Sequence, residues 1–329
     1  MARTRYATDR GLIARMGATM FLLGLVFTGF IVALFFVLAY YNRGGSSGNG
    51  AGLIFFVALI GIGTAFASYY WSDKIALRTS GARLVGPADS RGAARLHEVM
   101  DRLCALADMP KPRVAIAPTA MPNAFATGRS SKVAVLCVTQ GLLDKLDDNE
   151  ELEGVLAHEM SHVAHKDVAV MTIASFLGII AALLVRFAFY SELFGGGGGR
   201  GRGGGRGGNN QGGLPIMLVV MVVGMVVYAV SFLLIRLLSR YRELSADRSG
   251  ALLTGQPSKL ASALVKVTGD IARIPTRDLR AAEPLNAFYF APALSSLKGQ
   301  MSLSSLFSTH PPLEKRLAQL DKISKQLSR

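Results

Sequence analysis

The hexapeptide AHEMSH, residues 157–162, combines residue types and a spacing that can carry hydrolytic chemistry. His158 and His162 are four residues apart, so on a helix their imidazoles are stacked neighbours that can bind one metal ion. Glu159 can face the same cleft and act as a general base without binding the metal. This is the H-E-x-x-H pattern, in which one helix supplies two zinc ligands and the base. The alternative interpretation is two histidines that merely share a helix.

Catalytic zinc needs a third protein ligand and keeps one position open. His165 lies too close on the same helix to complete a tetrahedral site, and His97 lies in a separate amphipathic segment. The segment SRYRELSAD, residues 239–247, offers Glu243 and Asp247, again four residues apart. We expect Glu243 to be the third ligand of one zinc ion per chain, and Asp247 to accept the far N–H of a ligand histidine. A solvated helix face is the alternative interpretation of this pair.

Two helices are predicted around these residues. The segment DDNEELEGVLAHEMSHVAHKD, residues 147–167, begins with good N-cap residues and acidic side chains. It continues with an apolar stripe at helical spacing, which predicts that both histidines lie on one helix. The segment RGAARLHEVMDRLCALADM, residues 91–109, shows the same periodicity and predicts an earlier helix.

Three short strands are expected between these helices, in RVAIAPT, NAFATG and KVAVLCVT. Their β-branched and alternating residues favour a small antiparallel sheet. Asn123, Ala124 and Phe125 belong to the middle strand. An extended peptide could add to the open edge of that strand through main-chain hydrogen bonds, which makes these residues candidates for substrate alignment. An ordinary strand of the sheet is the alternative.

Long apolar runs set the class of the chain. Half of the 329 residues are hydrophobic, and the mean hydropathy is +0.35. Each run is at least as long as the roughly 20 residues that cross a bilayer core. We therefore expect about four transmembrane helices rather than the core helices of a soluble protein. The runs are residues 17–41, 51–70, 168–190 and 214–238.

Basic residues beside these runs predict their orientation, because Lys and Arg favour the cytoplasmic side. They gather before the first run, after the second and after the fourth, which places both termini in the cytoplasm. We expect a membrane anchor with two spans (1–71), the first half of a cytoplasmic domain (72–166), a transmembrane hairpin (167–238) and the second half of that domain (239–329).

The net charge of +14 does not require a nucleic-acid partner. In a membrane protein, basic cytoplasmic loops against anionic lipid account for such a charge, so the bilayer is the expected partner. The loop of residues 195–213 is rich in Gly and Arg without aromatic residues, and we interpret it as a flexible tether. Cys104 and Cys137 are expected to be free thiols in a reducing compartment.

The motifs HEMSH at 158–162, SRYRELSAD at 239–247 and THPPLEKRL at 309–317, in this order, resemble the HtpX-type membrane zinc metalloproteases. Those proteins belong to a larger family that includes the CAAX-processing prenyl-peptide endopeptidases. The resemblance extends over nearly the whole chain and includes PNAFATG at 122–128 and ELEGVLAHEMSHVAHKD at 151–167. The long loop at 195–213 is a departure from the family pattern, but it carries no site residue.

The resemblance implies an α+β membrane protein with a zincin-like cytoplasmic protease domain of helices and a small sheet. It implies zinc bound by His158, His162 and Glu243, with Glu159 as the catalytic base. It also implies a stress-related quality-control role at the inner membrane, on damaged or misassembled membrane proteins. The main alternative is a non-enzymatic zinc-binding scaffold or regulator, which would gain nothing from a carboxylate at position 159.

His310, in STHPPLEKRL, is the histidine of the second polar segment. The two prolines after it disfavour a helix before them, and a helix is expected from about Leu313. His310 could be a structural residue at this helix entry. Alternatively it could reach the zinc cleft, where it would donate to a developing oxyanion or occupy the fourth zinc position as a gating ligand.

Overall fold

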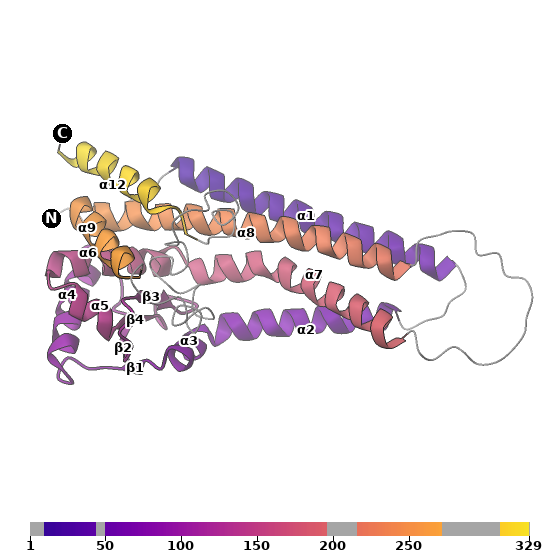
Figure 1. Cartoon of the computed structure of the whole chain (residues 1–329), viewed down its shortest axis with the longest axis horizontal. Coiled ribbons are helices and arrows are strands. Elements are labelled where there is room, and N and C mark those ends of the chain that lie inside the picture. The colour runs from indigo at the N-terminus through magenta and orange to yellow at the C-terminus, as the bar shows by residue number, and fades with distance from the viewer. Residues whose placement is uncertain (1–9, 44–49, 196–215, 272–309, 329) are drawn as a thin grey trace, which may run out of the picture. The chain divides into compact units, whose positions relative to one another are not determined.

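The computed structural model describes residues 10–43, 50–195, 216–271 and 310–328 (Figure 1). Most of the Gly/Arg-rich loop expected at 195–213, and residues 272–309 of the expected second domain half, lie outside these described residues. The helices are α1 (Arg10–Arg43), α2 (Gly50–Tyr70), α3 (Ser72–Ser80), α4 (Arg91–Ala107), α5 (Gln140–Lys145), α6 (Asn149–Ala164), α7 (Asp167–Gly195), α8 (Ile216–Thr254), α9 (Pro257–Ile271) and α12 (Leu313–Leu327). The strands are β1 (Arg83–Leu84), β2 (Arg113–Ala117), β3 (Ala124–Thr127) and β4 (Val135–Thr139).

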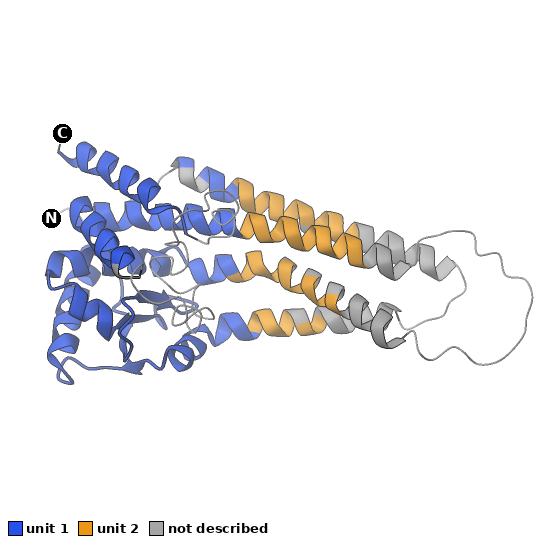
Figure 2. Cartoon of the chain, viewed as in Figure 1, with its two compact units in different colours: residues 1–17, 67–171, 236–329 blue, residues 18–66, 172–235 orange. Residues whose placement is uncertain are grey.

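The chain divides into two compact units (Figure 2). Unit 1 comprises residues 1–17, 67–171 and 236–329, and unit 2 comprises residues 18–66 and 172–235. Unit 1 therefore contains the sheet, the helices α3–α6, α9 and α12, and the C-terminal turns of α8. Every residue proposed for chemistry in the sequence lies in unit 1.

The sheet of unit 1 is mixed, so the expectation of an antiparallel sheet is wrong in one pairing. The strand order is β1-β2-β4-β3. β2 and β4 are parallel, whereas β1 pairs with β2 and β3 pairs with β4 in antiparallel register. A parallel pair needs a long crossover, and here the stretch that contains β3 provides it. β4 is buried along its whole length, which suits a central strand, and this arrangement leaves β3 at the edge.

Both faces of the sheet are covered within unit 1. On one face, the apolar stripes of α4 and α6 pack with residues of β2, β3 and β4, and α9 and α12 join the same core. This core includes Leu96 and Met100 of α4 and Leu152, Val155 and Leu156 of α6, all of them buried. The periodic residues seen in the sequence therefore do face the core. On the other face, a smaller cluster joins Ala76 of α3 to residues of the three longer strands.

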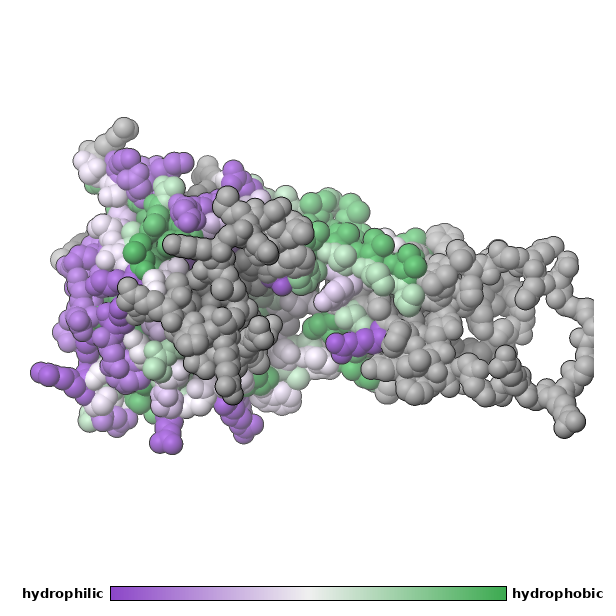
Figure 3. All heavy atoms as spheres, in the orientation of Figure 1, coloured by the Kyte–Doolittle hydropathy of each residue, from purple (hydrophilic) through white to green (hydrophobic). Residues whose placement is uncertain are grey.

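Unit 2 consists of apolar helical segments with a thin shared core. Phe30 of α1, Ile180 of α7 and Val227 of α8 form its buried cluster. Many other apolar side chains stay exposed, such as Phe21 at 70% and Val226 at 57%. On the face drawn in Figure 3, hydrophobic residues gather along the described parts of α1 and α8, whereas hydrophilic residues gather over α4 and α12. Such exposed apolar surface is typical of contact with lipid.

One helix in the described part of the chain, Met221–Thr254, is by itself long and apolar enough to cross a membrane. The pair Asn149–Ala164 and Asp167–Ile180, bent by 58°, passes the same test only when taken together. The expected count of four spans therefore stays a prediction.

Candidate metal centre

The helix that carries the two histidines forms where the sequence predicts it. Asp148 is the N-cap of α6, and its carboxylate accepts a hydrogen bond of 2.8 Å from the Glu150 N–H. This cap satisfies a backbone donor that the first turn leaves without an intrahelical partner. His158 lies deep in unit 1 with 1% of its surface exposed, and His162 is one turn further on, partly exposed. α6 therefore presents two imidazoles, that of His158 in the core and that of His162 nearer the surface.

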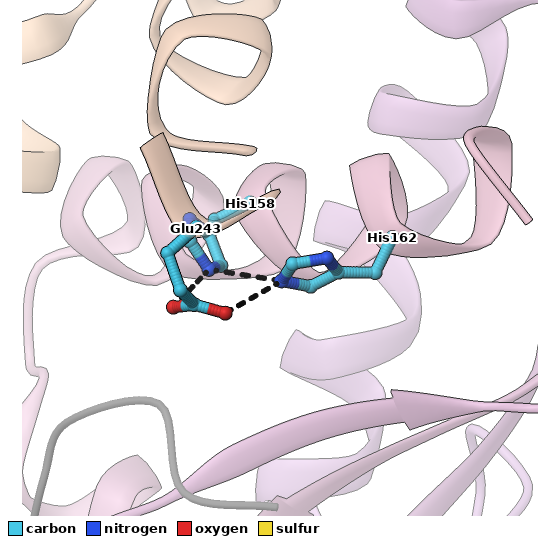
Figure 4. A group of neighbouring side chains, drawn as sticks. All are labelled: His158, His162 and Glu243. Carbon is cyan, nitrogen blue, oxygen red and sulfur yellow. Dashed lines mark hydrogen bonds and ion pairs between the residues drawn. The ribbon is translucent and has the colours of Figure 1, made fainter. Parts of the chain in front are cut away.

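α8 brings Glu243 to these histidines, and a glycine allows the close approach. A Cβ atom added at Gly250 of α8 would lie 2.9 Å from the backbone nitrogen of His158, closer than real Cβ contacts. Gly250 thus lets the backbones of α8 and α6 approach at the level of the site. Glu243, two turns earlier on α8, then lies beside both histidines (Figure 4).

The three candidate ligand side chains form a small triangle (Figure 4), in which Glu243 meets each histidine with a different carboxylate oxygen. His158 Nε2 and His162 Nε2 are 3.3 Å apart. Glu243 Oε1 lies 3.5 Å from His162 Nε2, and Glu243 Oε2 lies 3.7 Å from His158 Nε2. A tetrahedral ion with bonds of about 2.0–2.2 Å holds its ligand atoms about 3.3–3.6 Å apart. The triangle therefore fits one four-coordinate metal ion with one position left over, and among the described residues this is the one group of His, Cys, Asp and Glu that meets the spacing.

His158 is oriented by a second carboxylate on α8. Asp247 Oδ1 lies 2.9 Å from His158 Nδ1, so this carboxylate can accept the ring N–H and leave Nε2 facing the triangle. Arg316 of α12 holds the same carboxylate with two bonds, from Nε to Oδ2 at 2.7 Å and from Nη2 to Oδ1 at 2.6 Å. All three side chains are buried. A carboxylate–histidine pair of this kind fixes the tautomer of a metal ligand.

His162 has an equivalent partner at the start of the next helix. Asp167 Oδ2 accepts from His162 Nδ1 and also receives Nη2 of Arg242 at 2.8 Å. Asp167 is the first residue of α7, directly after the bend that ends α6. Both histidines are thus held by a carboxylate that is itself paired with an arginine, and in both cases the histidine Nε2 is directed to Glu243.

Glu243 has its own histidine partner. His310 precedes α12, is buried, and places Nδ1 3.0 Å from Glu243 Oε2. His310 therefore meets the site through a side chain of the triangle. This contact was not among the roles that the sequence suggested for it, and the roles of oxyanion donor and gating ligand stay predictions.

Glu159 lies between α6 and the edge strand. The backbone N–H of Ala126 in β3 donates to Glu159 Oε2 at 3.0 Å. Burial raises the pKa of the Glu159 carboxyl to about 8, with Glu243 adding to the rise and His162 opposing it. A cation held by the triangle would favour the ionised carboxylate, which is the form a general base needs.

The edge strand exposes alternate backbone groups. Thr139 N donates to Asn123 O at 2.9 Å, so Asn123 faces β4. In an antiparallel ladder the direction alternates, so Phe125 also faces β4, whereas Ala124 and Ala126 direct their N–H and C=O groups to the open edge. Of the three residues predicted for this edge, Ala124 has its backbone on the open side, and Ala126, which sequence reasoning did not name, shares that side.

Three further residues of the site were missed. Asp167 is the last residue of the motif segment HEMSHVAHKD and stands at the start of an apolar run. A carboxylate at such a position is expected to be buried and therefore to need a partner, which is the signal that could have found it. Arg242 precedes Glu243 directly. Arg316 gave no local signal, because its partner Asp247 is 69 positions away.

Comparisons with known proteins found several that are similar to this chain. The model of peptidase family M48 matches residues 90–324. Protease HtpX homolog 1 of Streptomyces coelicolor is 54% identical over 326 residues, covering 99% of this chain and 97% of that protein. Protease HtpX homolog 2 of Methanosarcina mazei is 47% identical over 326 residues, covering 99% of this chain and 100% of that protein. A crystal structure of Ste24p from S. mikatae is also similar, at 17% identity and a TM-score of 0.46, covering 95% of this chain and 67% of that one.

The matched region contains both histidines, Glu159, Glu243, Asp247 and His310, which are the residues that the structure gathers. Relatives that are proteases do not favour a non-enzymatic scaffold. The chain belongs to peptidase family M48 and is a membrane-anchored metalloprotease of the HtpX type.

Proposed function

We propose that this protein is a zinc endopeptidase whose metal is held by His158, His162 and Glu243. The observation that carries the proposal is the triangle of ligand side chains, whose facing nitrogen and oxygen atoms lie 3.3, 3.5 and 3.7 Å apart. Two imidazoles and one carboxylate match the ligand set of catalytic zinc, which keeps its fourth position open. Zinc held there would supply Lewis acidity to a water molecule and to the carbonyl of the peptide bond.

In this proposal Glu159 is the general acid and base. Its carboxylate takes a proton from the attacking water and then passes that proton to the leaving amine. The Ala126 N–H orients Oε2 of this carboxylate from the side of the edge strand. Asp247 and Asp167 keep the two ligand histidines in the tautomer that leaves Nε2 without a proton.

The substrate is proposed to be an extended segment of a protein chain. On the open side of β3, next to Glu159, Ala124 has its N–H and C=O groups and Ala126 has its C=O group, while the Ala126 N–H donates to Glu159. A peptide that adds to this edge as a further strand would bring its carbonyl groups past the site with little demand on its side chains. Broad specificity of this kind suits a quality-control role on damaged membrane proteins in the stress response.

We propose that catalysis takes place on the cytoplasmic side, with residues 72–166 and 239–329 as two halves of one protease domain. Residues 1–71 would then be a two-span anchor, and residues 167–238 a hairpin of two further spans, in the inner or plasma membrane. The support for this arrangement is the distribution of Lys and Arg around the apolar runs.

Metal analysis and proteolysis of the purified full-length protein test the proposal. We expect one zinc per chain by elemental analysis and cleavage of casein or self-cleavage. Glu159→Gln should keep the zinc and lose cleavage, whereas Glu243→Ala should lose both. Glu98→Gln on α4, an exposed position, is the matched control and should keep both. Full cleavage by Glu159→Gln would remove the proposed base, and full zinc in Glu243→Ala would place the third ligand elsewhere.

A further inference from the structure

The junction of α2 and α3 carries apolar and basic side chains that the protein leaves uncovered. Tyr70, Trp71 and Ile75 are 42%, 45% and 46% exposed. Lys74 and Arg78, on the following turns, are exposed as well. The helical hydrogen bonds continue through the junction, from Trp71 N to Ala67 O and from Ile75 N to Trp71 O. This surface therefore begins where the uncharged run 51–70 ends.

The opposite face of α3 is fixed to the sheet. Asp73 is buried and forms an ion pair of 2.6 Å with Arg113 of β2. Ala76 packs in the cluster that contains Phe125 of β3 and Cys137 of β4. α3 therefore has one face occupied by the sheet, and the face with Trp71 and Ile75 points away from it.

A second group of contacts ties the end of the edge strand to the same junction. The guanidinium of Arg129 lies 4.2 Å above the Tyr70 ring, and its Nη1 donates to the Tyr70 carbonyl at 3.3 Å. The Tyr69 hydroxyl donates to the Arg129 carbonyl at 3.4 Å. Arg129 comes two positions after the last residue of β3. The end of the strand beside Glu159 is thus fastened to the residues that close the apolar run.

We propose that this face is a docking surface for anionic phospholipid headgroups, with Tyr70, Trp71 and Ile75 in the interfacial layer and Lys74, Arg78 and Arg129 on the phosphates. Tyr and Trp at the end of an apolar span are typical of the membrane interface. A short amphipathic helix with basic residues next to a span binds anionic lipid. The one acidic residue of α3, Asp73, is turned inward to Arg113, so the outward charges are all positive.

Docking of this surface on the bilayer would also orient the edge strand β3 relative to membrane substrates. Because Arg129 binds the ring and the carbonyl of Tyr70, the C-terminal end of β3 is held at the bilayer surface. An unfolded segment that emerges from the membrane would then meet the open edge of β3 before it reaches bulk solvent. The inference rests on the membrane anchoring of the chain and is independent of the proposed zinc chemistry.

The chain itself carries the probe for a test, because Trp71 is its single tryptophan. The full-length protein is reconstituted in vesicles of phosphatidylcholine with equal fractions of nitroxide-labelled phosphatidylcholine or nitroxide-labelled phosphatidylglycerol. We expect both labels to quench Trp71, phosphatidylglycerol more strongly, and aqueous iodide to quench it weakly. Strong quenching by iodide without quenching by lipid would show that the face lies in water and overturn the proposal. Equal quenching by the two lipids would overturn the assignment to anionic headgroups.

Charge variants separate specific docking from a general effect of charge. Lys74→Gln with Arg78→Gln should remove the preference for phosphatidylglycerol, because each basic residue changes such a preference by about fivefold. Lys322→Gln with Lys325→Gln removes two exposed charges from α12 and should leave the preference unchanged. An equal loss in both double variants would overturn the assignment to this face. These measurements do not depend on proteolysis. A failure of the proposed zinc chemistry would therefore not look like a failure of the proposed lipid docking.

Discussion

Arg316 and Asp247 form a buried ion pair with two parallel bonds, although they lie on different helices and 69 positions apart. The pair stands directly behind the candidate ligand His158, whose Nδ1 lies 2.9 Å from the same carboxylate. Arg316 thereby connects α12 to the metal centre, and its Nη1 also lies 3.9 Å from Glu243 Oε2. Removing one member leaves a buried charge without compensation, which is the costly case for ion pairs.

Arg316→Met is expected to destabilise the protein by about 3–5 kcal/mol, because it leaves the buried carboxylate of Asp247 without its arginine and with His158 as its neighbour. Zinc affinity should fall by roughly 10–100-fold, as for other groups that orient a ligand. Arg316→Lys should rescue little, since lysine cannot make the two parallel bonds. Thermal unfolding in detergent and zinc competition with a chelator measure both effects.

Lys325→Met is the matched control for that prediction. It breaks the pair of Lys325 with Asp321 on the same helix, whose side chains are 72% and 59% exposed. Exposed pairs contribute about 0–1 kcal/mol, so stability and zinc affinity should stay close to those of the parent protein. Equal losses in Arg316→Met and Lys325→Met would contradict a special role for the buried pair.

Gly250→Ala tests the close approach of α8 to α6. The new Cβ would meet the His158 nitrogen at 2.9 Å, and a backbone atom cannot swing aside as a side chain can. α8 should shift, widen the triangle and weaken zinc binding, and the melting temperature should fall. Gly92→Ala on α4 is the control, because its Cβ would meet side-chain atoms alone, Leu143 Cδ1 at 3.4 Å and Ser90 Oγ at 3.9 Å. A normal zinc affinity in Gly250→Ala would show that the helices have room at this point.

The sequence predicts local elements well and their pairing less well. α4 and α6 follow from periodicity and capping, because those signals lie within a few residues of each other. The parallel pairing of β2 with β4 does not follow, since the strand patterns do not say whether β3 or β4 lies in the middle of the sheet, and β4 does so here with β2 on one side and β3 on the other. The short helix α5, the helix α9 and the two-residue strand β1 were not predicted either.

The residues of the site were likewise predictable where they lie close together in the sequence, and not where they are far apart. His158, Glu159 and His162 are one local pattern, and Glu243 with Asp247 is another, so both could be named in advance. Arg242 and Arg316, which pair with the carboxylates of Asp167 and Asp247, could not be named in advance. A buried charge on one helix does not indicate which other helix carries its partner. The contact of His310 with Glu243 spans 67 positions and depends in the same way on the tertiary fold.

His310→Ala is expected to weaken zinc binding by roughly 10–100-fold, because its Nδ1 supports the carboxylate of Glu243. Turnover at saturating zinc should remain near that of the parent. An oxyanion donor would behave oppositely, losing about 10²–10³ in turnover with zinc retained. A gating ligand would give unchanged or higher turnover with faster zinc loss. His97→Ala, which removes a contact with the Val85 carbonyl, is the control and should alter neither zinc retention nor turnover.

The topology of the chain can be tested by cysteine labelling without removing its two native cysteines. Cys104 and Cys137 are free and buried, and burial raises the pKa values of their thiols to about 11 and about 12. Their thiolate forms are scarce below these values, so both should resist a membrane-impermeant maleimide at neutral pH. A cysteine introduced at Gly204 should be labelled from outside intact cells, and one at Lys298 only after permeabilisation. Labelling of the Lys298 position from outside would reverse the proposed orientation. Protection of the Gly204 position would instead mean that the hairpin 167–238 does not reach the outer surface.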